Sequence, residues 1–142
     1  TYPLHIILRF NLEQKIFNNE IKISDIPELW NYEYKKLFNK EVDMDSNGCL
    51  QDVHWYAGLF GYFPTYSLGA LTAAQLASQL RQDVLNLDDQ VEKGDFKELL
   101  QWLKSNVHSK ASLYSSNEIL QQVTNSNLNA KYFEDYIKNR YL

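Results

Sequence analysis

Apolar residues recur at helical spacing from the N-terminus onward. The first apolar stripe, at four-residue spacing, consists of Leu4, Leu8, Leu12 and Ile16. It predicts a helix over residues 2–18 that is buried on much of its circumference. A second stripe on the same segment contains the polar residues His5, Arg9 and Glu13.

Five further segments carry helical patterns. They run from Ser24 or Asp25 to about Phe38, over residues 65–87, over residues 96–109, onward from Ser115 or Ser116, and over residues 130–142. N-cap residues and Pro27 support several of these starts. Residues 39–51 contain turn formers and no periodicity, so we expect a loop there. Because no segment alternates with period two, the sequence predicts an all-α protein with an irregular array of about six helices.

Length and composition exclude several classes of function. The 142 residues and 44% hydrophobic content fit one domain. A net charge of -4 without a basic cluster argues against a nucleic-acid partner. The single cysteine, Cys49, fits a reducing cytoplasm, and no apolar run is long enough to cross a membrane. The chain also starts without methionine inside an apolar, periodic segment, which is typical of a fragment.

Motifs for autonomous catalysis are missing from the sequence. His5, His54 and His108 are scattered singly and none belongs to an HExxH pair, so we expect no zinc site within this chain alone. No serine lies in a Gly-x-Ser-x-Gly turn, and Cys49 is expected to be a small, half-buried residue. The glycines match no nucleotide-binding fingerprint.

The stretch GCLQDVHWYAGLFGYFPTYSLG, residues 48–69, remains as the candidate functional region. It gathers the polar and aromatic residues Gln51, Asp52, His54, Trp55, Tyr62 and Tyr66. Buried polar aromatics need hydrogen-bond partners, so this group forms either a satisfied core network or a site for a ligand. Spacing alone leaves both interpretations open.

Several motifs in order carry a resemblance to a known family. GCLQDVHW, residues 48–55, matches the pattern GxxQDxHW of the carboxypeptidase Taq family. Residues 1–13 are similar to the family run LTYPLHIILRFELE, and residues 56–75 are similar to SxGxFGYFPTYxLGxLxAAQ. Residues 95–141 resemble the C-terminal end of the family. The resemblance therefore covers essentially the whole chain.

The resemblance implies part of a larger helical, zinc-dependent metallocarboxypeptidase with a deep cleft. Such an enzyme is cytoplasmic and homodimeric, and it removes single residues from the C-termini of peptides with broad specificity. The HExxH pair, the downstream glutamate and the IRxxAD motif of the family have no match here. We therefore expect residues 1–142 to be a C-terminal portion that binds no catalytic zinc and hydrolyses nothing without the N-terminal part of the same enzyme.

Analogy with related helical peptidases assigns roles within the candidate region. Tyr66 is the first candidate and Tyr62 the second for donating a hydrogen bond to the oxyanion. His54 and Arg9 are expected to meet the substrate, while Gln51 and Asp52 are expected to orient His54 or to fix the loop. Each role has a packing alternative, which for Arg9 is an interior pair with Glu13. The alternative for the whole chain is a catalytically dead helical interaction module on a peptidase-derived scaffold.

Overall fold

The computed structural model describes residues 2–142, and this part of the chain is all-α without strands. The seven helices are α1 (Tyr2–Phe17), α2 (Ile26–Phe38), α3 (Pro64–Asp83), α4 (Leu87–Glu92), α5 (Lys97–Asn106), α6 (Ser116–Thr124) and α7 (Lys131–Tyr141). The predicted fold class is confirmed. The chain divides into two compact units, the first ending at Leu68 and the second spanning Gly69–Leu142, so the boundary falls within α3.

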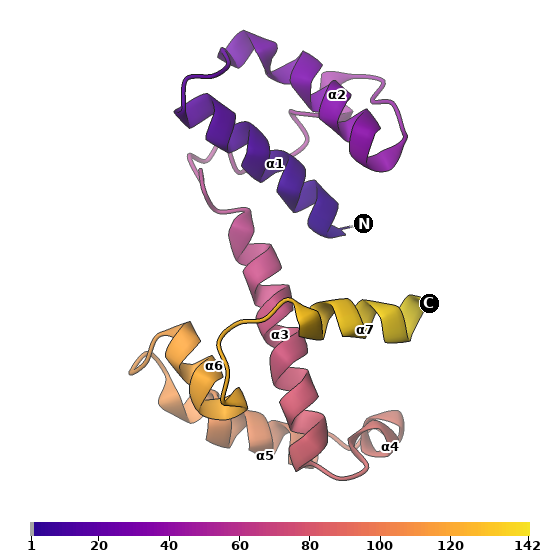
Figure 1. Cartoon of the computed structure of the whole chain (residues 1–142), viewed down its shortest axis with the longest axis vertical. Coiled ribbons are helices and arrows are strands. Elements are labelled where there is room, and N and C mark those ends of the chain that lie inside the picture. Colours follow the sequence, from indigo (N-terminus) through magenta and orange to yellow (C-terminus); the bar gives the residue numbers. More distant parts are fainter. Residues whose placement is uncertain (1) are drawn as a thin grey trace. The chain divides into compact units, whose positions relative to one another are not determined.

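The first unit is built on α1 and α2, which pack side by side (Figure 1). Its core contains the buried residues Leu8, Leu12, Ile26, Trp30 and Cys49. The apolar stripe predicted for the first helix supplies Leu8 and Leu12, as its spacing requires. Helix α2 carries a proline in its first turn and stops at Asn39, whose φ of 52° is left-handed.

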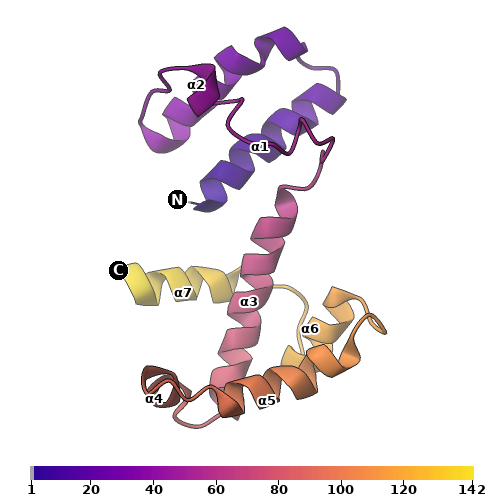
Figure 2. The same ribbon diagram turned by 180° about the vertical axis from the view of Figure 1, so that it is seen from behind.

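A long connection joins α2 to α3 and returns across α1, as Figure 2 illustrates. It contains one short 3₁₀ turn, Asp45–Asn47, and is otherwise irregular. Gly58 and Gly61 take φ values of 73° and 72°, which bend the chain sharply in the middle of the aromatic stretch. The predicted loop over residues 39–51 therefore continues to the start of α3.

The second unit has a separate core, formed by Leu80, Val84, Leu87 and Trp102. The helix predicted over residues 65–87 ends at Asp83, because Asn86 adopts a left-handed φ of 57° and Leu87 opens the separate helix α4. This additional helix explains why seven helices are found where about six were expected. His108 lies in a 3₁₀ turn after α5 rather than in its last turn.

Two polar arrangements fix the later helices of this unit. Ser115 and Glu118 form the expected capping box at the start of α6. Gln75, fully buried on α3, donates to Thr124, Ser126 and Asn127 and accepts from the Asn129 amide.

Among the described helices, none combines the length and apolar character that crossing a bilayer requires.

Candidate functional site

His54, Tyr62 and Tyr66 come together in the first unit. The ring centroid of His54 lies 5.8 Å from that of Tyr62 and 5.9 Å from that of Tyr66, and the two tyrosine rings are 5.5 Å apart. His54 lies in a turn of the long connection between α2 and α3, Tyr62 lies close before α3, and Tyr66 lies in the first turn of α3. The bend at Gly58 and Gly61 is what brings these segments side by side.

A direct hydrogen bond links the imidazole to one of the phenols. Nε2 of His54 and Oη of Tyr66 are 3.0 Å apart. The other ring nitrogen, Nδ1, is buried and has no hydrogen-bond partner among the described residues. Buried polar atoms in native proteins normally have partners, so this nitrogen has capacity for one more hydrogen bond.

The two phenols differ from ordinary core tyrosines in remaining partly accessible. Tyr66 is 37% exposed and Tyr62 is 44% exposed. Partial burial raises the pKa of the Tyr66 phenol above its ordinary value, and the neighbouring Tyr62, Tyr2 and Asp52 raise it further. Tyr66 therefore keeps its proton at neutral pH and can act as a hydrogen-bond donor.

Arg9 and Asp52 tie α1 to the loop beside this cluster. Arg9 Nε donates to Asp52 Oδ2 at 2.6 Å, and a second guanidinium nitrogen lies 2.5 Å from the same oxygen. The Arg9 side chain is buried, with its guanidinium carbon 4.8 Å from the ring centroid of Trp30. Asp52 thus lies where it fixes the loop, and Arg9 is paired with Asp52 rather than with Glu13.

Glu13 forms a second tie, which the sequence did not reveal. Its side chain is only 3% exposed, and its two carboxylate oxygens accept from different parts of the loop. Trp55 Nε1 donates at 2.8 Å and the Gly61 amide donates at 3.1 Å. The available signal was its spacing, since the apolar residues Phe10 and Ile16 stand three residues before and after Glu13 in the same helix.

The other predicted residues take places at the margin. Gln51 is exposed, and its side chain forms no hydrogen bond within the part of the chain that the structure describes. His5 stacks against Phe38 and Tyr34, at centroid distances of 4.2 and 6.1 Å. Burial lowers the pKa of His5, and the nearby Arg9 lowers it further.

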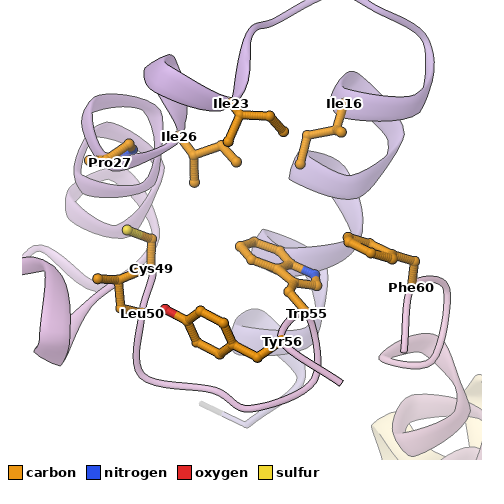
Figure 3. A pocket seen from close by; sticks show the side chains of 9 residues that line it. All are labelled: Ile16, Ile23, Ile26, Pro27, Cys49, Leu50, Trp55, Tyr56 and Phe60. Atoms are coloured by element: carbon orange, nitrogen blue, oxygen red, sulfur yellow. The ribbon is translucent and has the colours of Figure 1, made fainter. Parts of the chain in front are cut away.

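An apolar pocket of about 250 Å³ opens between the end of α1, the start of α2 and the loop (Figure 3). It is lined by Ile16, Ile23, Ile26, Pro27, Cys49, Leu50, Trp55, Tyr56 and Phe60. Burial raises the pKa of the Cys49 thiol, and Asp45 raises it further, so the thiolate that nucleophilic chemistry requires is disfavoured. The pocket suits an apolar group rather than a reaction.

A metal centre does not fit the described residues. Residues 2–142 contain no group of three or more histidine, cysteine or carboxylate side chains placed to hold an ion. Stable sites for transition metals normally use three or four such ligands. What this region offers is a pair of phenols and an imidazole beside the Arg9–Asp52 ion pair and the buried carboxylate of Glu13.

Comparison with known proteins gives one consistent result. The family model for the carboxypeptidase Taq (M32) metallopeptidases matches residues 1–141. Carboxypeptidase 1 of Bacillus subtilis is 42% identical over 141 residues, which are 99% of this chain and 28% of that relative. The chain thus spans a little over a quarter of the length of this relative.

Solved structures agree with the sequence match. The carboxypeptidase of Pyrococcus furiosus superposes with a TM-score of 0.96 at 39% identity, covering all of this chain and 29% of that one. Metallocarboxypeptidase 1 of Trypanosoma cruzi gives a TM-score of 0.93 at 38% identity, covering 99% of this chain and 30% of that one.

Proposed function

Because the chain belongs to the carboxypeptidase Taq (M32) metallopeptidase family, we propose that it is the C-terminal portion of a zinc-dependent, homodimeric metallocarboxypeptidase. That enzyme releases single C-terminal amino acids from peptides. The chain contributes one wall of the substrate cleft, and the rest of the same polypeptide contributes the metal ligands and the general base.

The observation that carries this proposal is the hydrogen-bonded pair of His54 and Tyr66. A core network would leave its members satisfied and covered, whereas this pair keeps an unpartnered Nδ1 and an accessible phenol. The ring of Tyr62 lies 5.8 Å from that of His54 and 5.5 Å from that of Tyr66, which is close enough for one ligand to contact all three. These features favour contact with substrate over packing alone.

The expected chemistry follows from the charge that develops during amide hydrolysis. When a nucleophile adds to the scissile carbonyl, its oxygen becomes negative, and a donor placed in advance stabilises that oxygen more than it stabilises the ground-state carbonyl. Tyr66 is the first choice for this donor, because it is the tyrosine whose hydroxyl is held by a hydrogen bond to His54. In this role Nε2–H of His54 donates to Oη of Tyr66, so the phenol proton stays free for the oxyanion and Nδ1 is left to accept from a backbone N–H of the substrate.

On this proposal the metal ligands come from the rest of the polypeptide, and it is supported by the finding that the described residues contain no group of three or more histidine, cysteine or carboxylate side chains placed to hold an ion. Arg9 is committed to Asp52, so its part is to secure the loop, and a direct contact with the substrate carboxylate would require that ion pair to open. Without the remaining polypeptide, the chain is expected to release no amino acids.

Replacing Tyr66 by phenylalanine in the full-length enzyme tests the proposal. Tyr66→Phe removes one hydroxyl, so we expect kcat to fall by about a hundredfold or more while KM changes little. Tyr62→Phe, measured in parallel, tests the second candidate. Steady-state release of C-terminal residues from a short peptide gives both constants.

Tyr114→Phe is the matched control, since Tyr114 is an exposed tyrosine of the second unit. It should leave kcat and KM unchanged. Wild-type kcat in Tyr66→Phe would remove Tyr66 from the mechanism. Wild-type kcat in both Tyr66→Phe and Tyr62→Phe would refute the proposal that this cluster meets the reacting carbonyl.

A further inference from the structure

The turn that carries the candidate cluster has little packing of its own. Every residue from 56 to 62 is exposed. Backbone bonds close its first half, including those from Ala57 to Val53 and from Leu59 to His54. Between Leu59 and Thr65, the Gly61 amide is the one backbone donor of the described residues with a hydrogen bond, and its acceptor is Glu13.

From this geometry we infer that Glu13 is a positioning residue that keeps the side chains of His54, Tyr62 and Tyr66 in their positions relative to one another. One carboxylate oxygen takes the indole N–H of Trp55, the residue directly after His54. The other takes the amide of Gly61, the residue directly before Tyr62. A single side chain on α1 therefore accepts hydrogen bonds from the turn on both sides of its bend.

The free-energy cost of burying the Glu13 carboxylate indicates that its hydrogen bonds to the loop, and not packing alone, keep it in place. A carboxylate that is 3% exposed is costly to bury, and the cost is offset only when its oxygens accept good hydrogen bonds. Arg9, one helical turn away, is occupied by Asp52 and does not neutralise Glu13 directly. The loop donors are thus the partners that make burial of Glu13 tolerable, and they are fixed in return.

The inference rests on the proposed function only where it takes His54 and Tyr66 as the groups that meet substrate. The physical claim, that Glu13 fixes the turn, stands without it. The two claims therefore need separate measurements.

Hydrogen exchange of the full-length enzyme, read by mass spectrometry, tests the physical claim. Glu13→Gln keeps the size of the side chain but leaves one acceptor oxygen facing two donors, so one bond is lost and an N–H group meets an N–H group. We expect exchange in peptides covering residues 57–66 to become about tenfold faster. Glu28→Gln, a change at an exposed carboxylate of α2, is the control and should leave exchange there unchanged.

Trp55→Phe provides a second variant in case Glu13→Gln disturbs the whole unit. It removes the indole donor while keeping an aromatic ring, so exchange should rise near residues 53–59 and less at Gly61. Wild-type exchange in both variants would overturn the inference. Faster exchange in either variant, with α1 and α2 still protected, supports it.

The activity of Glu13→Gln then separates the inference from the proposed function. If the cluster meets the substrate, kcat should fall at least tenfold with little change in KM, because the donors lose their register. Faster exchange with an unchanged kcat would leave Glu13 as the residue that fixes the turn and would show that catalysis does not depend on it, while Tyr66→Phe and Tyr62→Phe decide the role of the cluster. Unchanged exchange in both Glu13→Gln and Trp55→Phe would overturn the inference whatever the activity of Tyr66→Phe.

Discussion

At the scale of single residues, the most informative pair is Arg9 with Asp52. The Arg9 side chain is 6% exposed and that of Asp52 is 32% exposed, so the bond lies at the edge of the core. Removing one partner of such a pair leaves a charge with reduced access to water. We expect Asp52→Asn to lower the free energy of unfolding by about 2–3 kcal/mol, measured by urea denaturation.

A surface ion pair provides the contrast for this prediction. Lys35 and Glu41 are 61% and 77% exposed and lie 2.6 Å apart. Water and salt screen such a pair, so Glu41→Gln should change stability by less than about 0.5 kcal/mol. Equal losses in the two variants would mean that Arg9 finds adequate solvation without Asp52.

Which charged residues pair with each other was the least predictable property of the sequence. Periodicity placed Arg9 and Glu13 on one stripe, and their four-residue spacing suggested an interior pair. The loop supplies partners for both instead, through Asp52, Trp55 and Gly61. Such pairing depends on how a segment more than forty residues away folds back, and helical spacing carries no information about that.

At the scale of elements, the helical pattern was sufficient for most of the fold. Starts with recognisable caps were predicted closely for α2 and α6, and so was the end of α2. The break between α3 and α4 was missed, because an asparagine in a left-handed conformation ends a helix without interrupting the apolar pattern. The bend that assembles the aromatic cluster was likewise invisible to periodicity, although its glycines were noted.

Two glycines in different elements give a test at this scale. Gly69 lies within α3, with open space where a Cβ atom would stand. Gly48 lies in the loop, where a Cβ atom would stand 2.9 Å from Val42 Cγ1 and 3.3 Å from the Trp30 ring. The same methyl group therefore meets open space at one position and the core at the other.

Alanine should accordingly have opposite effects at these positions. Gly69→Ala lowers the backbone entropy of the unfolded chain and should stabilise the protein by about 0.5–1 kcal/mol. Gly48→Ala forces Val42 or Trp30 to shift and should destabilise it by about 1–3 kcal/mol. Urea midpoints of the two variants give the comparison, and a gain in stability for Gly48→Ala would show that the core yields without strain.

At the scale of the whole molecule, several large apolar side chains around the pocket of the first unit remain exposed. The most exposed side chains around the pocket are Ile23, Leu50, Tyr56 and Phe60 (Figure 3). Contiguous apolar patches on soluble monomers are small, and larger ones normally mark a surface that another protein segment covers. This surface fits a portion of a larger enzyme better than a module that functions alone.

Solution behaviour of the isolated chain distinguishes these two interpretations. A portion separated from the rest of its enzyme should self-associate as its concentration rises, since association removes the apolar surface from water. Light scattering coupled to size-exclusion chromatography measures this directly.

Leu50→Lys places a charge at the rim of the pocket and should shift the chain towards monomer. Leu113→Lys changes an exposed leucine of the second unit and should have no such effect. A wild-type chain that remains monodisperse across the concentration range would favour the interaction module over the severed portion of a peptidase.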